Sequence, residues 1–176
     1  MATVFTIGHS NRSWEDFLSI LKAHGIRTLI DIRRFPSSAK WPQFNRETMR
    51  KALAVERIEY LWLEALGGRR HSQSKSSPNL GLRNAGFRNY ADHMHTAPFA
   101  EAIGEVLRRA AQTPAAIMCA EALYFRCHRM LVSDWLVAHG HEVLHLQSTG
   151  AAHPHRLTNA ARITNGRLTY PGENLF

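Results

Sequence analysis

The chain of 176 residues has 22 Lys and Arg against 14 Asp and Glu, a net charge of +8. This length suits one domain, 1–176, and a hydrophobic content of 44% is ordinary for a globular protein. The absence of a run of about 18 apolar residues argues against a membrane span, and the N-terminus does not resemble a secretory signal. Two cysteines are too few for a disulfide framework, so we expect a reducing, cytoplasmic setting.

Short apolar runs alternate with helical patterns along the chain. Ser13, Asn45 and Thr96 can each cap a helix, and a further helix carries Met130 to Leu136. This alternation predicts an α/β fold with three layers, in which helices cover both faces of a mostly parallel central sheet of about five strands. The predicted strands are Val4–Ile7, Ile26–Ile32, Ile58–Leu63, Ala115–Met118 and Glu142–Leu146.

Two segments depart from this alternation. Residues 67–89 are rich in Gly, Ser, Asn and Arg, and so predict a long basic loop of the kind that often carries function. After Leu146 the chain reads as irregular, with His153-Pro154-His155 as a solvated turn. Asn165-Gly166 then predicts a short hairpin within 163–170.

Polar side chains follow each predicted strand. Because the carboxyl ends of parallel strands meet at one edge of a sheet, these side chains should gather in one cleft. The stretch from 115 to 136 is the most informative, since both cysteines lie in its strand-to-helix connection together with a carboxylate, an imidazole and two arginines. The residues expected at this edge are His9, Ser10, Asn11, Asp31, Arg33, Arg34, Phe35, Glu64, Arg69, Arg70, Cys119, Glu121, Arg126, Cys127, His128, Arg129 and His145.

Several segments also carry a family resemblance. TIGHSNRSWEDFLSILKAHGI, LIDIRRFP, PQFN, IEYLWLEALGG, GFRNYADHM, MCAE and CHR follow one another within residues 4–147. In this order they resemble the domain-of-unknown-function 488 family. The resemblance implies an α/β domain but no particular reaction. It also implies a set of shared polar residues, which here are His9, Ser10, Asp31, Arg33, Asn45, Glu121, Cys127, His128 and Arg129.

The first functional hypothesis is an enzyme, a hydrolase that cleaves a glycosidic or phosphate bond in DNA, RNA or a nucleotide, with a role in DNA repair or base processing. Glu121, partly buried, would exchange protons, Asp31 would stay ionised, and His9 would assist. Arginines bind phosphate oxygens well. Those expected to do so are Arg33, Arg69, Arg70, Arg126 and Arg129. Aromatic residues suited either to base stacking or to the core are Trp41, Phe44, Phe87 and Tyr90.

Three alternatives remain open. Cys119 or Cys127 could be a nucleophile, as in phosphatases or sulfurtransferases, although no glycine follows Cys119 to cradle an anion. Cys127-His128-Arg129 is similar to the acceptor motif of alkylguanine-DNA alkyltransferases, over three residues only. The two cysteines with His128 and His9 or His145 could bind a metal, but their spacing gives no metal motif, and neither metal nor cofactor is predicted. A binding module for nucleic acid without chemistry is the last class.

Overall fold

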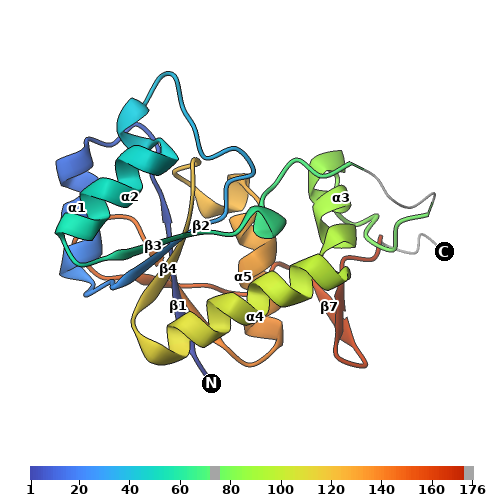
Figure 1. Ribbon diagram of the computed structural model, residues 1–176. Coiled ribbons are helices and arrows are strands. Elements are labelled where there is room, and N and C mark those ends of the chain that lie inside the picture. Colours follow the sequence, from blue (N-terminus) through green and yellow to red (C-terminus); the bar gives the residue numbers. More distant parts are fainter. Residues whose placement is uncertain (72–75, 173–176) are drawn as a thin grey trace.

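The computed structural model describes residues 1–71 and 76–172 (Figure 1). Within these ranges, helices and strands alternate as the sequence predicts. The helices are α1 (Trp14–Ala23), α2 (Arg46–Val55), α3 (Ala85–His93), α4 (Ala97–Gln112) and α5 (Arg129–Ala138). The strands are β1 (Thr3–Gly8), β2 (Thr28–Asp31), β3 (Glu59–Trp62), β4 (Ala115–Cys119), β5 (Glu142–Leu146), β6 (His153–Pro154), β7 (Arg162–Thr164) and β8 (Arg167–Thr169).

The central sheet has the strand order β3-β2-β4-β1-β5-β6. Neighbouring strands from β3 to β5 pair in parallel, and β6 adds an antiparallel edge to β5. The register places Gly8 beside Cys119, and Asp31 beside Met118. The carboxyl ends of β1, β2 and β4 therefore meet at one edge, as predicted.

Helices cover both faces of this sheet (Figure 1). On one face, α1 and α2 bury Phe17 and Met49 against strand residues such as Met118. On the other face, α4 and α5 bury Phe99 and Leu131. Successive side chains of a strand point to opposite faces. Cys119, one residue after Met118, consequently lies on the α4 and α5 side.

The predicted start of α1 is confirmed, because the Ser13 side chain accepts a hydrogen bond from the Asp16 backbone N–H. The loop predicted over 67–89 is wrong at its end. Helix α3 begins after Asn84, which caps it by accepting from the Phe87 N–H. Gly, Asn and Arg in this stretch concealed the helical spacing of Phe87, Tyr90 and Ala91. Residues 72–75 of the predicted loop lie outside the described part of the chain.

The tail is more ordered than predicted. His153 pairs with His145 of β5, and His155 is buried, so the solvated turn expected there is wrong. The predicted hairpin is confirmed as β7 and β8, with Asn165 and Gly166 at positive φ in its turn. Throughout the described ranges, the helices are too short or too polar to cross a membrane.

Gly8 should be intolerant of a side chain. A Cβ atom there would overlap the carbonyl oxygen of Glu121 and approach the Arg129 guanidinium, and both belong to a packed site. We expect Gly8→Ala to lower the free energy of unfolding by about 3 kcal/mol or more, measured by urea denaturation. Gly104→Ala is the matched control, because a Cβ on Gly104 within α4 meets nothing and should stabilise by about 0.5–1 kcal/mol. If both substitutions changed the free energy of unfolding equally, the close contact between Gly8 and the Glu121 carbonyl would be contradicted.

Candidate functional site

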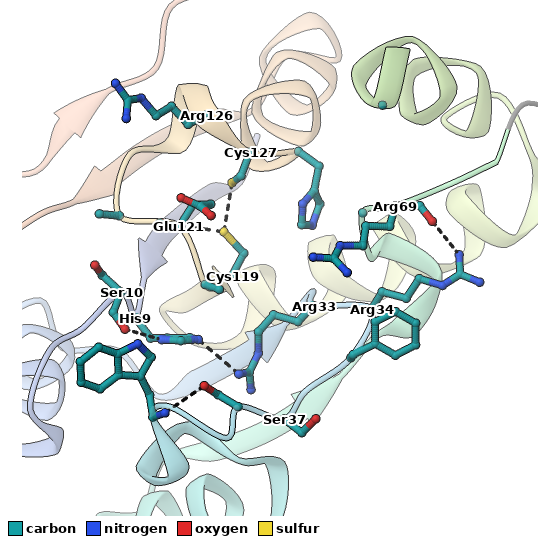
Figure 2. Close-up of a pocket in the computed structure, with 18 of the residues that line it drawn as sticks. His9, Ser10, Arg33, Arg34, Ser37, Arg69, Cys119, Glu121, Arg126 and Cys127 are labelled. Atoms are coloured by element: carbon teal, nitrogen blue, oxygen red, sulfur yellow. Dashed lines mark hydrogen bonds between the residues drawn. The ribbon is translucent and has the colours of Figure 1, made fainter. Parts of the chain in front are cut away.

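A pocket of about 830 Å³ opens at the carboxyl edge of the sheet. Its walls come from the segments after β1, β2, β3 and β4 and from α3 (Figure 2). The sequence-predicted residues that line it are His9, Ser10, Asn11, Arg33, Arg34, Phe35, Arg69, Cys119, Glu121, Arg126, Cys127 and His128. The expected convergence of the strand ends therefore places most of the predicted residues around one cavity.

Two thiols lie at the floor of the pocket. Cys119 ends β4, and Cys127 follows the short 3-10 helix Tyr124–Arg126. Their sulfur atoms are 3.0 Å apart, and both cysteines are free and buried (Figure 2). The sequence-based prediction that they do not form a disulfide agrees with this arrangement.

The Arg129 guanidinium lies beneath both thiols and is 1% exposed. Its Nε donates to the Cys119 sulfur at 3.0 Å and to the Cys127 sulfur at 3.4 Å. Its two other nitrogens donate to the carbonyls of Glu121 and Ala122 and to the Thr6 hydroxyl. Arg129 is thus committed to holding the site from below, and the prediction that it contacts substrate phosphate does not fit this position.

The two thiols have opposite acidities. Burial alone would raise the pKa of Cys127, but the hydrogen bond from Cys119 and the charge and N–H groups of Arg129 lower this pKa to about 6. Burial and the same hydrogen bond raise the pKa of Cys119. Cys127 is therefore the thiol of the pair that ionises first. The sequence suggested that the thiol at the strand end would be the acidic one, but it is the thiol before the helix.

His9 and His128 are uncharged imidazoles at neutral pH. Burial lowers the pKa of each to about 4. His9 stacks on Phe44 and accepts from Arg33 at 3.3 Å, so its other ring nitrogen donates to the Ser10 carbonyl. With both nitrogens occupied, His9 positions Arg33 and is not free to act as a base. His128 donates from Nε2 to the Ile32 carbonyl, which leaves Nδ1 as an acceptor.

A buried chain of hydrogen bonds extends from Arg129 to the far side of α5. Thr6 Oγ1 is 2.7 Å from His145 Nδ1, and His145 Nε2 is 2.9 Å from His155 Nδ1. His155 Nε2 is in turn 2.8 Å from an Asp134 carboxylate oxygen. A carboxylate only accepts, so His155 Nε2 donates to Asp134, and an arginine only donates, so Thr6 accepts from Arg129. His145 was expected among the residues of the cleft, but it does not line the pocket and is instead part of this series of buried hydrogen bonds.

Asp31 does not belong to the pocket, which corrects its predicted role. Asp31 pairs with Met118, so its side chain lies on the α2 face of the sheet, opposite to the face that carries Cys119. The Asp31 side chain is fully buried there. Its carboxylate accepts from the Arg33 side chain at 2.6–3.1 Å and from the Tyr60 hydroxyl at 2.6 Å. With these partners, Asp31 holds Arg33 at the pocket wall and cannot reach a substrate.

Three further placements differ from the predictions. Glu121 lines the pocket but is exposed, so the partial burial expected to tune it is absent. Asn45 accepts from the Ser38 N–H and orders the loop before α2, without lining the pocket. Arg70 folds back on the carbonyls of Gly67 and Glu64.

The pocket rim contains two more residues expected at this edge, since Arg34 adds positive charge there and Phe35 is an exposed aromatic side chain. Of the aromatic residues left undecided between stacking and the core, Trp41 and Phe87 line the rim, half-buried, whereas Phe44 is wholly in the core. Sequence reasoning missed Lys40, whose signal was its place in RRFPSSAKW, a run of basic and aromatic residues directly after β2. Glu121 is the one acidic side chain among the described residues that line the cavity.

The metal hypothesis gains no geometric support. In the described ranges, no three His, Cys, Asp or Glu side chains are grouped so that they could hold an ion. His9 and His128 each have a ring nitrogen bonded to a backbone carbonyl, and His145 lies in the buried chain. These residues do not assemble around the two thiols as a ligand set.

Comparison with known proteins gives one match. A family model described as "Domain of unknown function DUF488" matches residues 13–136, which is most of the chain. The matched range contains α1 to α5 in part or whole and both cysteines. No curated protein and no solved structure matches the chain.

The acidity of Cys127 should depend on Arg129. In the native protein we expect alkylation of Cys127 by iodoacetamide to follow a pH profile with a midpoint near 6, resolved from Cys119 by peptide mass analysis. Arg129→Met removes a charge and the Nε donor to both sulfurs, and should raise the midpoint by at least about one pH unit. Arg126→Met removes an exposed charge on the same connection and should leave it unchanged. A midpoint near 9 in the native protein would contradict the thiolate assignment.

Stability should fall as the pH drops from 7 toward 5. In the folded state the pKa is about 4 for His9 and His128 and about 3 for His145, against 6.5 ordinarily. Below pH 6.5 the unfolded chain binds protons that the folded chain does not. Each of these histidines therefore lowers the free energy of unfolding by about 1.4 kcal/mol for each pH unit. The measurement is the urea midpoint at pH 7, 6 and 5. His145→Gln should flatten the dependence, whereas His139→Gln, at an exposed position, should not.

Proposed function

The chain belongs to the DUF488 family, and because that family has no known function we propose one from the site: a cysteine-dependent hydrolase that acts on a nucleotide or nucleic acid, with Cys127 as the nucleophile. The observation that carries this proposal is the pair of free thiols 3.0 Å apart at the floor of an arginine-rich pocket, with the Arg129 guanidinium donating to both sulfurs. A reducing, cytoplasmic setting would keep both thiols in their free state.

The reaction has two steps. Cys127 sulfur attacks an electrophilic centre of the substrate, and the bond to the leaving group breaks, which gives an S-linked intermediate. Water then attacks the same centre, the bond to sulfur breaks, and the thiolate is restored. The leaving group takes its proton from solvent in the first step, and Glu121, the carboxylate at the pocket, takes a proton from the attacking water in the second.

The substrate class follows from the rim. Positive side chains surround the pocket, and Arg69 and Arg126 are exposed there. Guanidinium groups bind phosphate oxygens in a bidentate manner, and Phe35 offers an exposed ring on which a base can stack. A volume of about 830 Å³ is sufficient for a nucleotide or for one flipped-out base with its phosphate. A role in DNA repair or base processing fits this substrate class.

Carboxylate catalysis by Glu121 and Asp31 is the second candidate, and the geometry supports it less. Asp31 accepts from Arg33 and Tyr60 on the other face of the sheet, so it cannot form a pair with Glu121 across a substrate. What favours this candidate is the position of Glu121 in the pocket beside exposed arginines. The two candidates differ in which side chain is indispensable.

Substitution of each group separates the candidates. The probes are p-nitrophenyl esters of phosphate, thymidine monophosphate and acetate, which report phosphomonoester, phosphodiester and acyl cleavage. Cys127→Ser should lower kcat/KM on the accepted probe by roughly 10³-fold or more, and Glu121→Gln by roughly 10²-fold. Arg108→Ala, on the outer surface of α4, is the control. Full activity in Cys127→Ser together with its loss in Glu121→Gln would establish the carboxylate mechanism instead.

Binding of a single-stranded oligonucleotide should weaken with salt. About four phosphate contacts predict a log–log slope of roughly −3, and Arg69→Ala should reduce its magnitude by about 0.7. Arg70 is left unchanged in this test, because it donates to the backbone carbonyls of Gly67 and Glu64 after β3. The readout is fluorescence anisotropy between 50 and about 300 mM salt. Salt-independent binding would point to a neutral ligand.

A further inference from the structure

The two pocket thiols are close enough for a second kind of chemistry that the hydrolytic function does not need. Their sulfur atoms are 3.0 Å apart, and a disulfide bond is about 2.0 Å long. We propose that Cys127 and Cys119 act as a dithiol couple that reduces a hydroperoxide, with Cys127 as the attacking thiol and Cys119 as the resolving thiol. This activity does not depend on the proposed hydrolysis.

The surroundings assign the two roles. Cys127 accepts from the Arg129 backbone N–H and side chain, and these donors stabilise a thiolate, which is the form that attacks peroxides. Cys119 is more deeply buried, and its sulfur lies 3.0 Å from the Cys127 sulfur. A buried thiol adjacent to the reactive one is the arrangement that captures a sulfenic acid as a disulfide.

Access to the sulfur favours a small electrophile. Cys127 lines the pocket, yet only 7% of it is exposed, and Cys119 is 2% exposed. Hydrogen peroxide and small organic hydroperoxides are compact and neutral, so they can reach a sulfur at the base of a cationic pocket. The Arg129 charge beside the sulfur stabilises the negative oxygen that leaves.

The reaction has two steps, oxidation of Cys127 and formation of the disulfide. The Cys127 thiolate attacks one peroxide oxygen, the O–O bond breaks, Cys127 becomes a sulfenic acid, and the other oxygen leaves and takes a proton. The Cys119 sulfur then attacks the Cys127 sulfur, the S–O bond breaks, and the departing hydroxide combines with the Cys119 proton to form water. In total, two thiols and one hydroperoxide give a disulfide, an alcohol (or water) and water. An external dithiol restores the two thiols.

The connection between the cysteines can accommodate the closure. Residues 120–126 run over the surface, and within them Phe125 is 49% exposed and Leu123 36% exposed. These two side chains do not anchor the connection, which is held instead by the Glu121 and Ala122 carbonyls on Arg129 and by Tyr124 stacked on His145. The required approach of the two sulfurs is about 1 Å, which a surface segment can absorb.

The test uses reduced protein and one equivalent of hydrogen peroxide, followed by intact mass analysis without reductant. We expect a loss of about 2 Da within the monomer, loss of both alkylatable thiols, and recovery of both with dithiothreitol. The rate should fall only about twofold from pH 7 to pH 6, whereas the rate of free cysteine falls about tenfold, because a pKa near 6 leaves half of Cys127 ionised.

Two variants test the roles. Cys119→Ser should stop at the sulfenic acid, which dimedone traps on Cys127, and Cys127→Ser should leave Cys119 unoxidised. Circular dichroism verifies that each variant is folded. The proposal is overturned if Cys127 goes directly to sulfinic acid in the native protein, if only disulfides between molecules form, or if the rate follows that of free cysteine. None of these outcomes depends on cleavage of a nucleotide probe, so hydrolysis and peroxide reduction can fail separately.

Discussion

The buried guanidinium of Arg129 is the interaction on which the site depends. It joins β1 through Thr6, β4 through Cys119, and the connection before α5 through the Glu121 carbonyl. A cation removed from water is costly unless its donors are satisfied and a negative charge lies close. The Cys127 thiolate supplies that charge. The cation and the thiolate therefore require each other, and the close approach of Gly8 to the Glu121 carbonyl makes room for both.

The sheet places a second buried cation on its opposite face. Arg33 pairs with Asp31 at 2.6 Å beneath α2, and His9 at the end of β1 links this pair to the pocket wall. The ends of the neighbouring strands β2 and β4 are thus each next to a buried arginine, on opposite faces of the sheet. Arg33 is neutralised by Asp31, and Arg129 lies against the two thiols. Only the Arg129 side leaves a nucleophile facing the cavity, since the Asp31 carboxylate is shielded by Arg33 and Tyr60. This asymmetry is the reason for assigning the chemistry to sulfur.

The floor and the rim of the pocket have different physical characters. The floor is buried, and its side chains are held in place by Arg129 and by the series of hydrogen bonds that ends at Asp134. Asp134 itself also accepts from Thr158 and Tyr170, which ties the tail of the chain to α5. The rim is exposed to solvent, positively charged and partly aromatic. A polyanion can therefore bind at the rim by charge, while the reactive sulfur stays in surroundings where its pKa is set by a few fixed neighbours.

The sequence by itself determined the strand and helix order, the Ser13 cap, the Asn165-Gly166 hairpin and the gathering of polar residues at one sheet edge, because these follow from periodicity and local backbone preference. Tertiary structure alone decided which of those residues face a substrate. Asp31 was excluded by the face it occupies. Cys127 was selected over Cys119 because the Arg129 backbone N–H also donates to it and because it is the more exposed of the two thiols. Arg129 is only two residues from Cys127, but its guanidinium is held against the two sulfurs by Thr6 of β1, and no local pattern encodes that contact.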